Sequence, residues 1–136
     1  MDATNKDDEG VIVIGVAYTK KKCTSGSVSS TFSEVAGYSY YTSEGNDYNS
    51  LSTRIQSELA EHYGISRTDV SIKSSRSPFA VIIQYDKEIA GWKCSVVKYA
   101  VGFGDDEDQA EANAVKMKNY DSSRSVYSKI KTIHKK

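Results

Sequence analysis

The sequence predicts an α+β domain in which an antiparallel sheet of five or six strands carries two helices on one face. Three observations predict this class. Short β-branched and aromatic runs of strand length recur along the chain, two other segments have helical spacing or helical end signals, and turn residues separate most of them. The expected order is β-β-α-β-β-β-α, followed by a last strand.

A chain of 136 residues suits one domain, which we expect at residues 11–134 after a disordered acidic tail at residues 1–10. Lys plus Arg and Asp plus Glu both total 18, and this zero net charge excludes a globally basic nucleic-acid binder. No apolar run reaches the ~18 residues of a spanning helix. The acidic start does not predict a signal peptide. The compartment stays open between the cytoplasm and the mature form of an exported protein.

The first predicted element is a strand at residues 11–18, VIVIGVAY, whose continuous β-branched run indicates burial on both faces. A small polar segment at residues 23–31 then turns the chain into an antiparallel strand at residues 31–41. Neither face of this second strand is cleanly apolar. We therefore expect it to lie at an edge of the sheet or to face a partner.

The first helix is predicted from residue 48, where apolar residues recur at steps of three and four. They are Tyr48, Leu51, Ile55, Leu59 and Tyr63. Asn46 or Asp47 is expected to cap the helix by accepting a backbone N–H, and Gly64 is expected to end it.

The second half of the chain repeats the alternation of strands and helix. Strands are predicted at residues 69–72, 79–85 and 92–104, and Pro78 marks the start of the middle one. The second helix is predicted at residues 105–118, with acidic residues at its start and Ala110, Ala114 and Met117 as its packing stripe. Residues 125–134 fit either a helix or a strand, and their β-branched content favours a strand.

The chain also contains two stretches that fit a β-hairpin-plus-helix repeat. In each stretch an apolar strand ends at a tyrosine, and a Lys-Cys pair follows. A true repeat would place Cys23 and Cys94 at equivalent positions. The two cysteines could form one disulfide or remain as two quiet thiols.

The turn before the second helix reads GFGDDEDQAEANA. With the helix-strand-strand-strand-helix order around it, this turn resembles that of double-stranded-RNA-binding domains, which carry glycines and alanines at the positions of Gly102, Gly104, Ala110 and Ala114. The resemblance implies a shared helix and sheet arrangement. The basic positions of that family are Glu107, Asp108 and Glu111 here, so the sign of the phosphate-binding positions is inverted. The resemblance therefore argues against duplex RNA.

Two further sites are alternatives to protein binding. The C-terminal block at residues 116–136 has seven basic residues against Asp121, and its Tyr120 and Tyr127 could stack on bases. The basic residues are Lys116, Lys118, Arg124, Lys129, Lys131, Lys135 and Lys136. The other alternative is a small enzyme with Cys94 as nucleophile, although no catalytic motif accompanies it. We expect no enzyme, cofactor or metal.

The most unusual feature is the content of ten tyrosines. Tyrosine offers a large contact area at low rotamer cost, so it is common on protein-recognition surfaces. We predict a non-enzymatic interaction module of the inhibitor, immunity or accessory type, with a protein partner and no nucleic acid; a homodimer stays open. The predicted partner-binding residues lie on the second strand and are Phe32, Glu34, Tyr38, Tyr40 and Tyr41.

Overall fold

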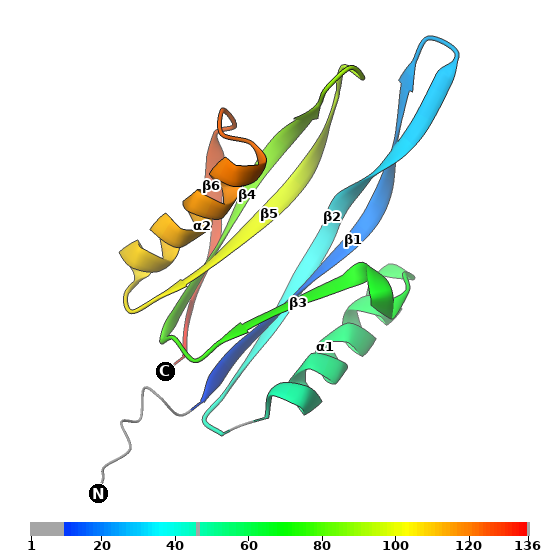
Figure 1. The fold of residues 1–136 in the computed structure, drawn as a ribbon. Coiled ribbons are helices and arrows are strands. Elements are labelled where there is room, and N and C mark those ends of the chain that lie inside the picture. Colours follow the sequence, from blue (N-terminus) through cyan, green and yellow to red (C-terminus); the bar gives the residue numbers. More distant parts are fainter. Residues whose placement is uncertain (1–9, 46, 136) are drawn as a thin grey trace, which may run out of the picture.

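The computed structural model describes residues 10–45 and 47–135, so most of the predicted acidic tail lies outside the described residues. The described chain is a small single α+β domain (Figure 1). Its elements are β1 (Val11–Ser25), β2 (Val28–Ser43), α1 (Tyr48–Tyr63), a short 3-10 turn (Arg67–Asp69), β3 (Val70–Ser75), β4 (Phe79–Ile89), β5 (Cys94–Gly104), α2 (Glu107–Asp121) and β6 (Tyr127–His134). The C-terminal segment is therefore a strand.

The six strands form two three-stranded antiparallel sheets, in the orders β2-β1-β3 and β5-β4-β6. The prediction of one sheet with both helices on one face is wrong. The physical reason lies in the two central strands, β1 and β4. Where each of them has a neighbouring strand on both sides, most of its side chains are buried on both faces of the sheet. One face of each sheet is covered by a helix, and the other face is covered by the opposite sheet.

Three apolar clusters define the resulting layers. Between the sheets, Ile12 and Ile14 of β1 pack with Ile82 of β4. On the outer face of the first sheet, other β1 side chains pack with Ile55 and Leu59 of α1. On the outer face of the second sheet, β4 side chains pack with the alanines of α2. The molecule is thus helix, sheet, sheet, helix, with a helix on either outside (Figure 1).

Both sheets share one topology. In each, a hairpin is followed by a helix, and a third strand then pairs with the free side of the first hairpin strand. The two cysteines do not take equivalent positions in this scheme, contrary to prediction, because Cys23 lies in the first strand of its hairpin and Cys94 in the second strand of the other. The sheet implied by the RNA-binding resemblance is also absent, since β3 pairs with β1 instead of β4.

The helix ends follow the sequence closely. α1 has the predicted bounds, and Gly64 ends it in the left-handed conformation at φ 65°. Asp47 stands at its start without capping it, and its carboxylate instead accepts a hydrogen bond from Ser43 Oγ at 2.5 Å. Asn46, the other predicted cap, lies outside the described residues. α2 starts two residues later than predicted, because Asp106 caps it by accepting from the Gln109 backbone N–H at 2.7 Å.

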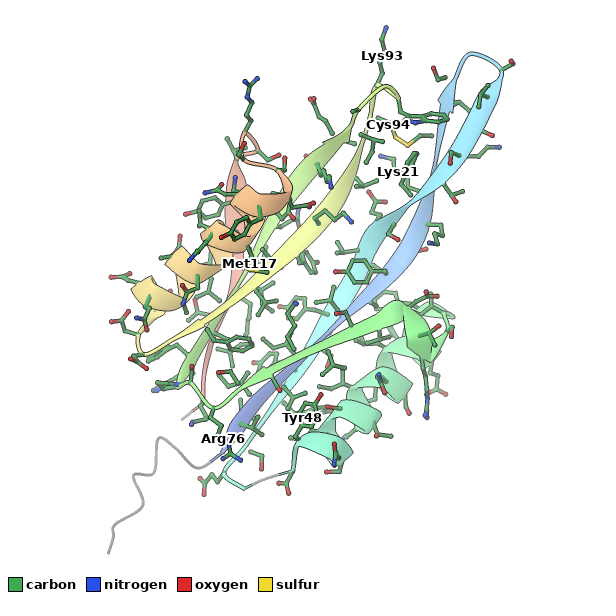
Figure 2. All side chains as sticks on the ribbon, viewed as in Figure 1. Lys21, Tyr48, Arg76, Lys93, Cys94 and Met117 are labelled. Atoms are coloured by element: carbon green, nitrogen blue, oxygen red, sulfur yellow. A yellow bond between two sulfur atoms is a disulfide. The ribbon has the colours of Figure 1, made fainter. Side chains whose placement is uncertain are left out.

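The packing face of α2 differs from the prediction in one position. Ala110 and Ala114 are fully buried, but Met117 is 49% exposed (Figure 2). Lys118 takes the next buried position, because the helix continues to Asp121 and its buried face follows steps of four. Gly102 lets α2 approach β5 closely, since a side chain there would overlap the Ala110 carbonyl and the Ala114 backbone N. The glycines of the GFG turn thus serve helix packing.

Beyond β3, the β1–β2 hairpin continues as a two-stranded ribbon, residues 19–34, which we call the first arm. Beyond β6, the β4–β5 hairpin likewise continues as a two-stranded ribbon, residues 86–97, which we call the second arm. It extends in the same direction as the first arm (Figure 1). A disulfide between Cys23 and Cys94 joins the two arms, with a Cα–Cα distance of 6.1 Å. Figure 2 shows Lys21 and Cys94 where the arms meet.

Candidate functional site: the outer edge of strand β2

The candidate site is the free edge of β2, the outer strand of the first sheet. β2 is 16 residues long and pairs with β1 on one side only. One bulge, opposite the step from Ala17 to Tyr18, divides it into a half within the first arm and a half over the body of the domain. The sequence left this strand either at an edge or facing a partner, and the structure places it at an edge.

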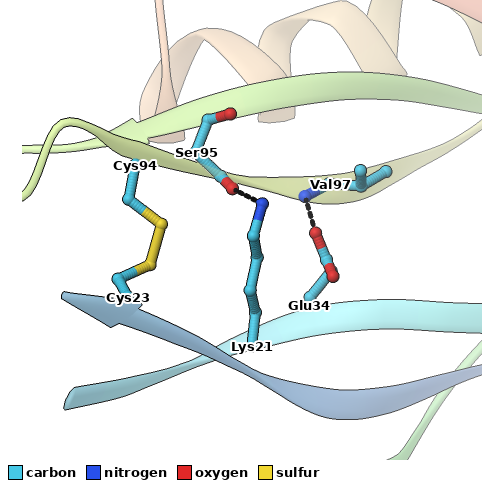
Figure 3. The surroundings of a disulfide bond; sticks show 6 residues. All are labelled: Lys21, Cys23, Glu34, Cys94, Ser95 and Val97. Atoms are coloured by element: carbon cyan, nitrogen blue, oxygen red, sulfur yellow. Dashed lines mark hydrogen bonds between the residues drawn. A yellow bond between two sulfur atoms is a disulfide. The ribbon is translucent and has the colours of Figure 1, made fainter. Parts of the chain in front are cut away.

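Two of the predicted partner-binding residues, Phe32 and Glu34, hold the first arm against the second arm. Figure 3 shows the contact that Glu34 makes with β5. The Phe32 ring meets Trp92 edge to face, with 5.6 Å between centroids. The Val97 backbone N–H donates to the Glu34 carboxylate at 3.0 Å, and the Lys21 ammonium donates to the Ser95 carbonyl at 2.7 Å. Together with the disulfide, these contacts fix the two arms to each other.

Tyr38 and Tyr40, also predicted, are half-buried and pack against the apolar cluster between the sheets. Tyr38 lies edge to face with Tyr99 of β5 at 6.0 Å, and the Lys131 ammonium of β6 stands 5.4 Å from the Tyr40 ring centroid. Burial raises the pKa of Tyr99, with a further contribution from the neighbouring Tyr38. These two β2 tyrosines therefore take part in packing one sheet against the other.

Tyr41, the last predicted residue, turns to the opposite face and contacts α1. Its hydroxyl donates to Glu58 Oε1 at 2.7 Å, and the Arg54 guanidinium lies 4.4 Å from its ring centroid. Arg54 and Glu58 also pair at 3.1 Å. The hydrogen bond from Tyr41 and the one from Arg54 lower the pKa of the Glu58 carboxyl, and the bond to Glu58 raises the pKa of Tyr41.

The five predicted residues thus share one strand, but each contacts another element of the same molecule. What β2 offers to solvent is its main-chain edge and small side chains of the first arm. Val28, Ser29, Ser30 and Thr31 are all exposed, Val28 to 59%. The sequence prediction named residues of this strand but not these exposed positions of the first arm.

The other sheet edges carry devices that discourage further pairing. β5 has its edge groups at Ser95 and Val97 occupied by side chains of the first arm, and Asn113 of α2 donates to the Phe103 carbonyl at 2.6 Å. β3 is six residues long and β6 is eight, and both contain lysine. Within the first arm, β1 carries Lys20, Lys21 and Lys22 along its own free edge.

β2 carries no such device apart from its bulge. Its 16 residues include no Lys, Arg or Pro, and its one charged residue, Glu34, is turned onto β5. A long, neutral edge strand presents unpaired N–H and C=O groups as a template for another strand. The scarcity of charge in residues 28–43, with one carboxylate and no cation, is the sequence signal that points to this candidate edge.

The structure commits much of the basic C-terminal block to other contacts. Lys118 is buried, and Lys129 pairs with Glu107 at 2.6 Å and Glu111 at 3.2 Å. Tyr127 donates to Glu111 at 2.8 Å. The hydrogen bonds from Lys129 and Tyr127 lower the pKa values of these two glutamates. Carboxylates therefore neutralise Lys129 of this block, and loop carbonyls hold Lys118.

The catalytic alternative loses its nucleophile. The Cys94 sulfur is bonded to Cys23, so the thiolate that nucleophilic attack requires is absent. Residues 10–45 and 47–135 also contain no group of three metal-ligating side chains.

A polar pocket of about 680 Å³ lies between the second arm and the loop that follows α2. In it Asp121 accepts hydrogen bonds from Tyr85 at 2.7 Å and Lys87 at 2.6 Å. Burial acts to raise the pKa of Asp121, but these two bonds outweigh it and hold the pKa below its ordinary value. Burial, then the bond to Asp121, raises the pKa of Tyr85. Lys87 and Asp121 thus satisfy each other within this pocket.

Across the described ranges, no helix has the length and apolar character needed to cross a membrane. Comparison with protein-family models, curated proteins and solved structures finds no match to this chain.

Proposed function

We propose that this protein is a non-enzymatic interaction module that binds a protein partner through the free edge of β2. In this mode an extended segment of the partner pairs with β2 and adds a strand to the first sheet. The observation that carries the proposal is the contrast between edges. Three edges are short, charged or capped, whereas β2 is long, neutral and open.

The energetics fit a main-chain interface. A main-chain hydrogen bond contributes about 1 kcal/mol net, so six of them would supply roughly 6 kcal/mol. Association costs at least about 4 kcal/mol in lost freedom, so side-chain contacts must add to the affinity. The exposed Val28 and the half-buried tyrosines beside the edge can supply apolar area.

The arms explain how such an edge stays ordered. An isolated two-stranded ribbon is marginally stable in water. Here the disulfide, the Phe32–Trp92 contact and the Glu34–Val97 hydrogen bond brace the first arm on the second. A braced strand loses little conformational freedom on binding, which favours recognition.

The proposal is tested by using the tagged full chain to capture proteins from a native host lysate at low and high salt. The test bait carries Thr31→Lys and Thr42→Lys, which place charges at two exposed positions of β2. The matched control bait carries Ser128→Lys at an exposed position of the β6 edge. Nuclease treatment separates nucleic-acid carry-over from protein binding.

We expect a defined protein that persists at high salt, is retained by the Ser128→Lys bait and is lost from the β2 bait. Loss with both baits, or with neither, would place binding elsewhere on the molecule. Retention that nuclease and salt abolish would move the function to the basic block at residues 116–136.

A further inference from the structure

We infer that the strand added to β2 comes from a second copy of this chain, so that two first arms pair antiparallel about a two-fold axis near Thr31. This inference rests on the proposed function and names its partner. The contact would be isologous, with the same residues used on both copies. It would join the two first sheets into one continuous sheet across the dimer.

The neutrality of the edge is the first argument for a second copy. Self-pairing brings identical edges together, so a charge on the two-fold axis would face its like, and several charges of one sign along the edge would repel the second copy. β2 has no cation, and its single carboxylate is held inward by the Val97 N–H. By contrast, the β1 edge of the same arm has three consecutive lysines, which would repel a second copy.

Symmetry fixes the register. A two-fold axis normal to a sheet keeps the two sheet faces distinct, so opposed residues must lie on the same face and differ by an even number of positions. Over residues 28–34, the stretch before the bulge, the centre is Thr31. Thr31 then opposes Thr31, Ser29 opposes Ser33, and Val28 opposes Glu34. No like charges meet, and a Thr–Thr pair such as the one on the axis is favourable across strands.

Accessibility agrees with this register. The four residues from Val28 to Thr31 are exposed, whereas the half of β2 beyond the bulge is mostly half-buried under neighbouring elements. The first arm also projects past β3 and α1 (Figure 1). A second copy can therefore approach the arm edge in a region where the paired ribbon stands apart from the body of the domain.

The test uses opposite charges at the axis. The molar mass of the full chain is measured by sedimentation equilibrium over a range of concentrations for wild type, Thr31→Lys and Thr31→Glu. An equimolar mixture of the two variants is measured in the same way. Thr24→Lys, at an exposed position on β1 of the same arm, is the matched control. Circular dichroism checks that each variant is folded.

We expect wild type and Thr24→Lys to form dimers. Thr31→Lys and Thr31→Glu each place like charges face to face, so each should dimerise roughly tenfold more weakly or not at all. Their mixture should restore the dimer, because Lys then faces Glu. Amide exchange of wild type should slow in residues 28–34 as concentration rises, a readout that needs no variant.

A wild type that stays monomeric throughout the concentration range, or dimers unaffected by both Thr31 variants, would overturn the inference. If wild type is monomeric and a lysate protein is still lost from the β2 bait, the proposed function stands with a different partner. If wild type dimerises through other residues and no lysate protein depends on β2, both fail.

Discussion

At the scale of single residues, the close approach of α2 to the second sheet depends on the absence of a side chain. Gly102 lies under α2, where a Cβ would overlap backbone atoms of Ala110 and Ala114. Backbone cannot move aside as a flexible side chain can. The two small alanines of α2 and this glycine thus set the helix-to-sheet distance together.

Gly102→Ala is therefore expected to lower the free energy of unfolding by about 1–3 kcal/mol, the usual cost of overpacking. Urea denaturation measures the change. Gly45→Ala is the matched control, because a Cβ there would make an ordinary contact at 3.5 Å with the Asp47 carboxylate. Equal effects at the two positions would contradict the packing argument.

Asp121 predicts a pH dependence of stability. Its pKa is lower in the folded state than in the unfolded chain, so its contribution is present above the unfolded pKa of about 4 and is lost as pH falls through the folded pKa. Asp121→Asn should cost about 1–2 kcal/mol at pH 7 and progressively less toward pH 2. Thermal unfolding across this pH range tests it, with the exposed Asp105→Asn as control. A constant difference at every pH would argue against the carboxylate.

At the scale of elements, the loop after α2 is organised around one buried cation. The Lys118 ammonium donates to the carbonyls of Ser122, Ser123 and Ser125 at 3.1, 3.4 and 2.7 Å. Ser125 also donates to the Asp86 carbonyl at 2.5 Å, which ties the loop to β4. Lys118, the last residue of the predicted helix, thus holds the following loop in place through these three hydrogen bonds.

Lys118→Met keeps the length and apolar stem of the side chain and removes these three bonds. The loop should then open more often, and trypsin should cleave after the exposed Arg124 several-fold faster. Lys116→Met, an exposed neighbour on the same helix, serves as control. Cleavage at the wild-type rate in Lys118→Met would show that other contacts hold the loop.

Elements were predicted well where a local signal decides them. α1 was found with its exact bounds because a full apolar stripe and a terminal glycine mark it. The mixed faces of β2 left two alternatives, an edge position or a face turned to a partner, and the edge position is the one observed. Where its tyrosines point could not be predicted, because this depends on the second sheet, which pairs at long range. The sequence also did not predict that Lys118 is buried and Met117 exposed, because this depends on how far α2 continues.

At the scale of the whole molecule, the sequence predicted the class but not the division into two sheets. Whether β3 joins β4 or β1 is a choice between long-range pairings, and no residue in β3 decides it. The apolar character of β1 and β4 on both faces did indicate that more than one sheet face had to be covered. A strand with two apolar faces needs two covering layers, and a single sheet with helices on one face supplies only one.

The disulfide acts at this same scale because it closes a loop between residues 71 apart in sequence. The chain-entropy relation gives a stabilisation of about 4 kcal/mol for a loop of this length. The double variant Cys23→Ala, Cys94→Ala should unfold at correspondingly lower urea concentration. The same fall on adding a reductant to wild type, and none on adding it to the variant, would assign the effect to the bond. An unchanged midpoint would contradict it.

The matching topology of the two sheets has a consequence for synthesis. The first unit, through β3, leaves the ribosome with the inner face of its sheet still lacking its cover, since β4 to β6 are made later. Until then that apolar face is open to any similar surface, including the same unit of a neighbouring nascent chain. Only residues 76–78 separate β3 from β4, so the second unit is delivered beside the first at high effective concentration. The brevity of that connection favours closure within one chain over exchange of units between chains.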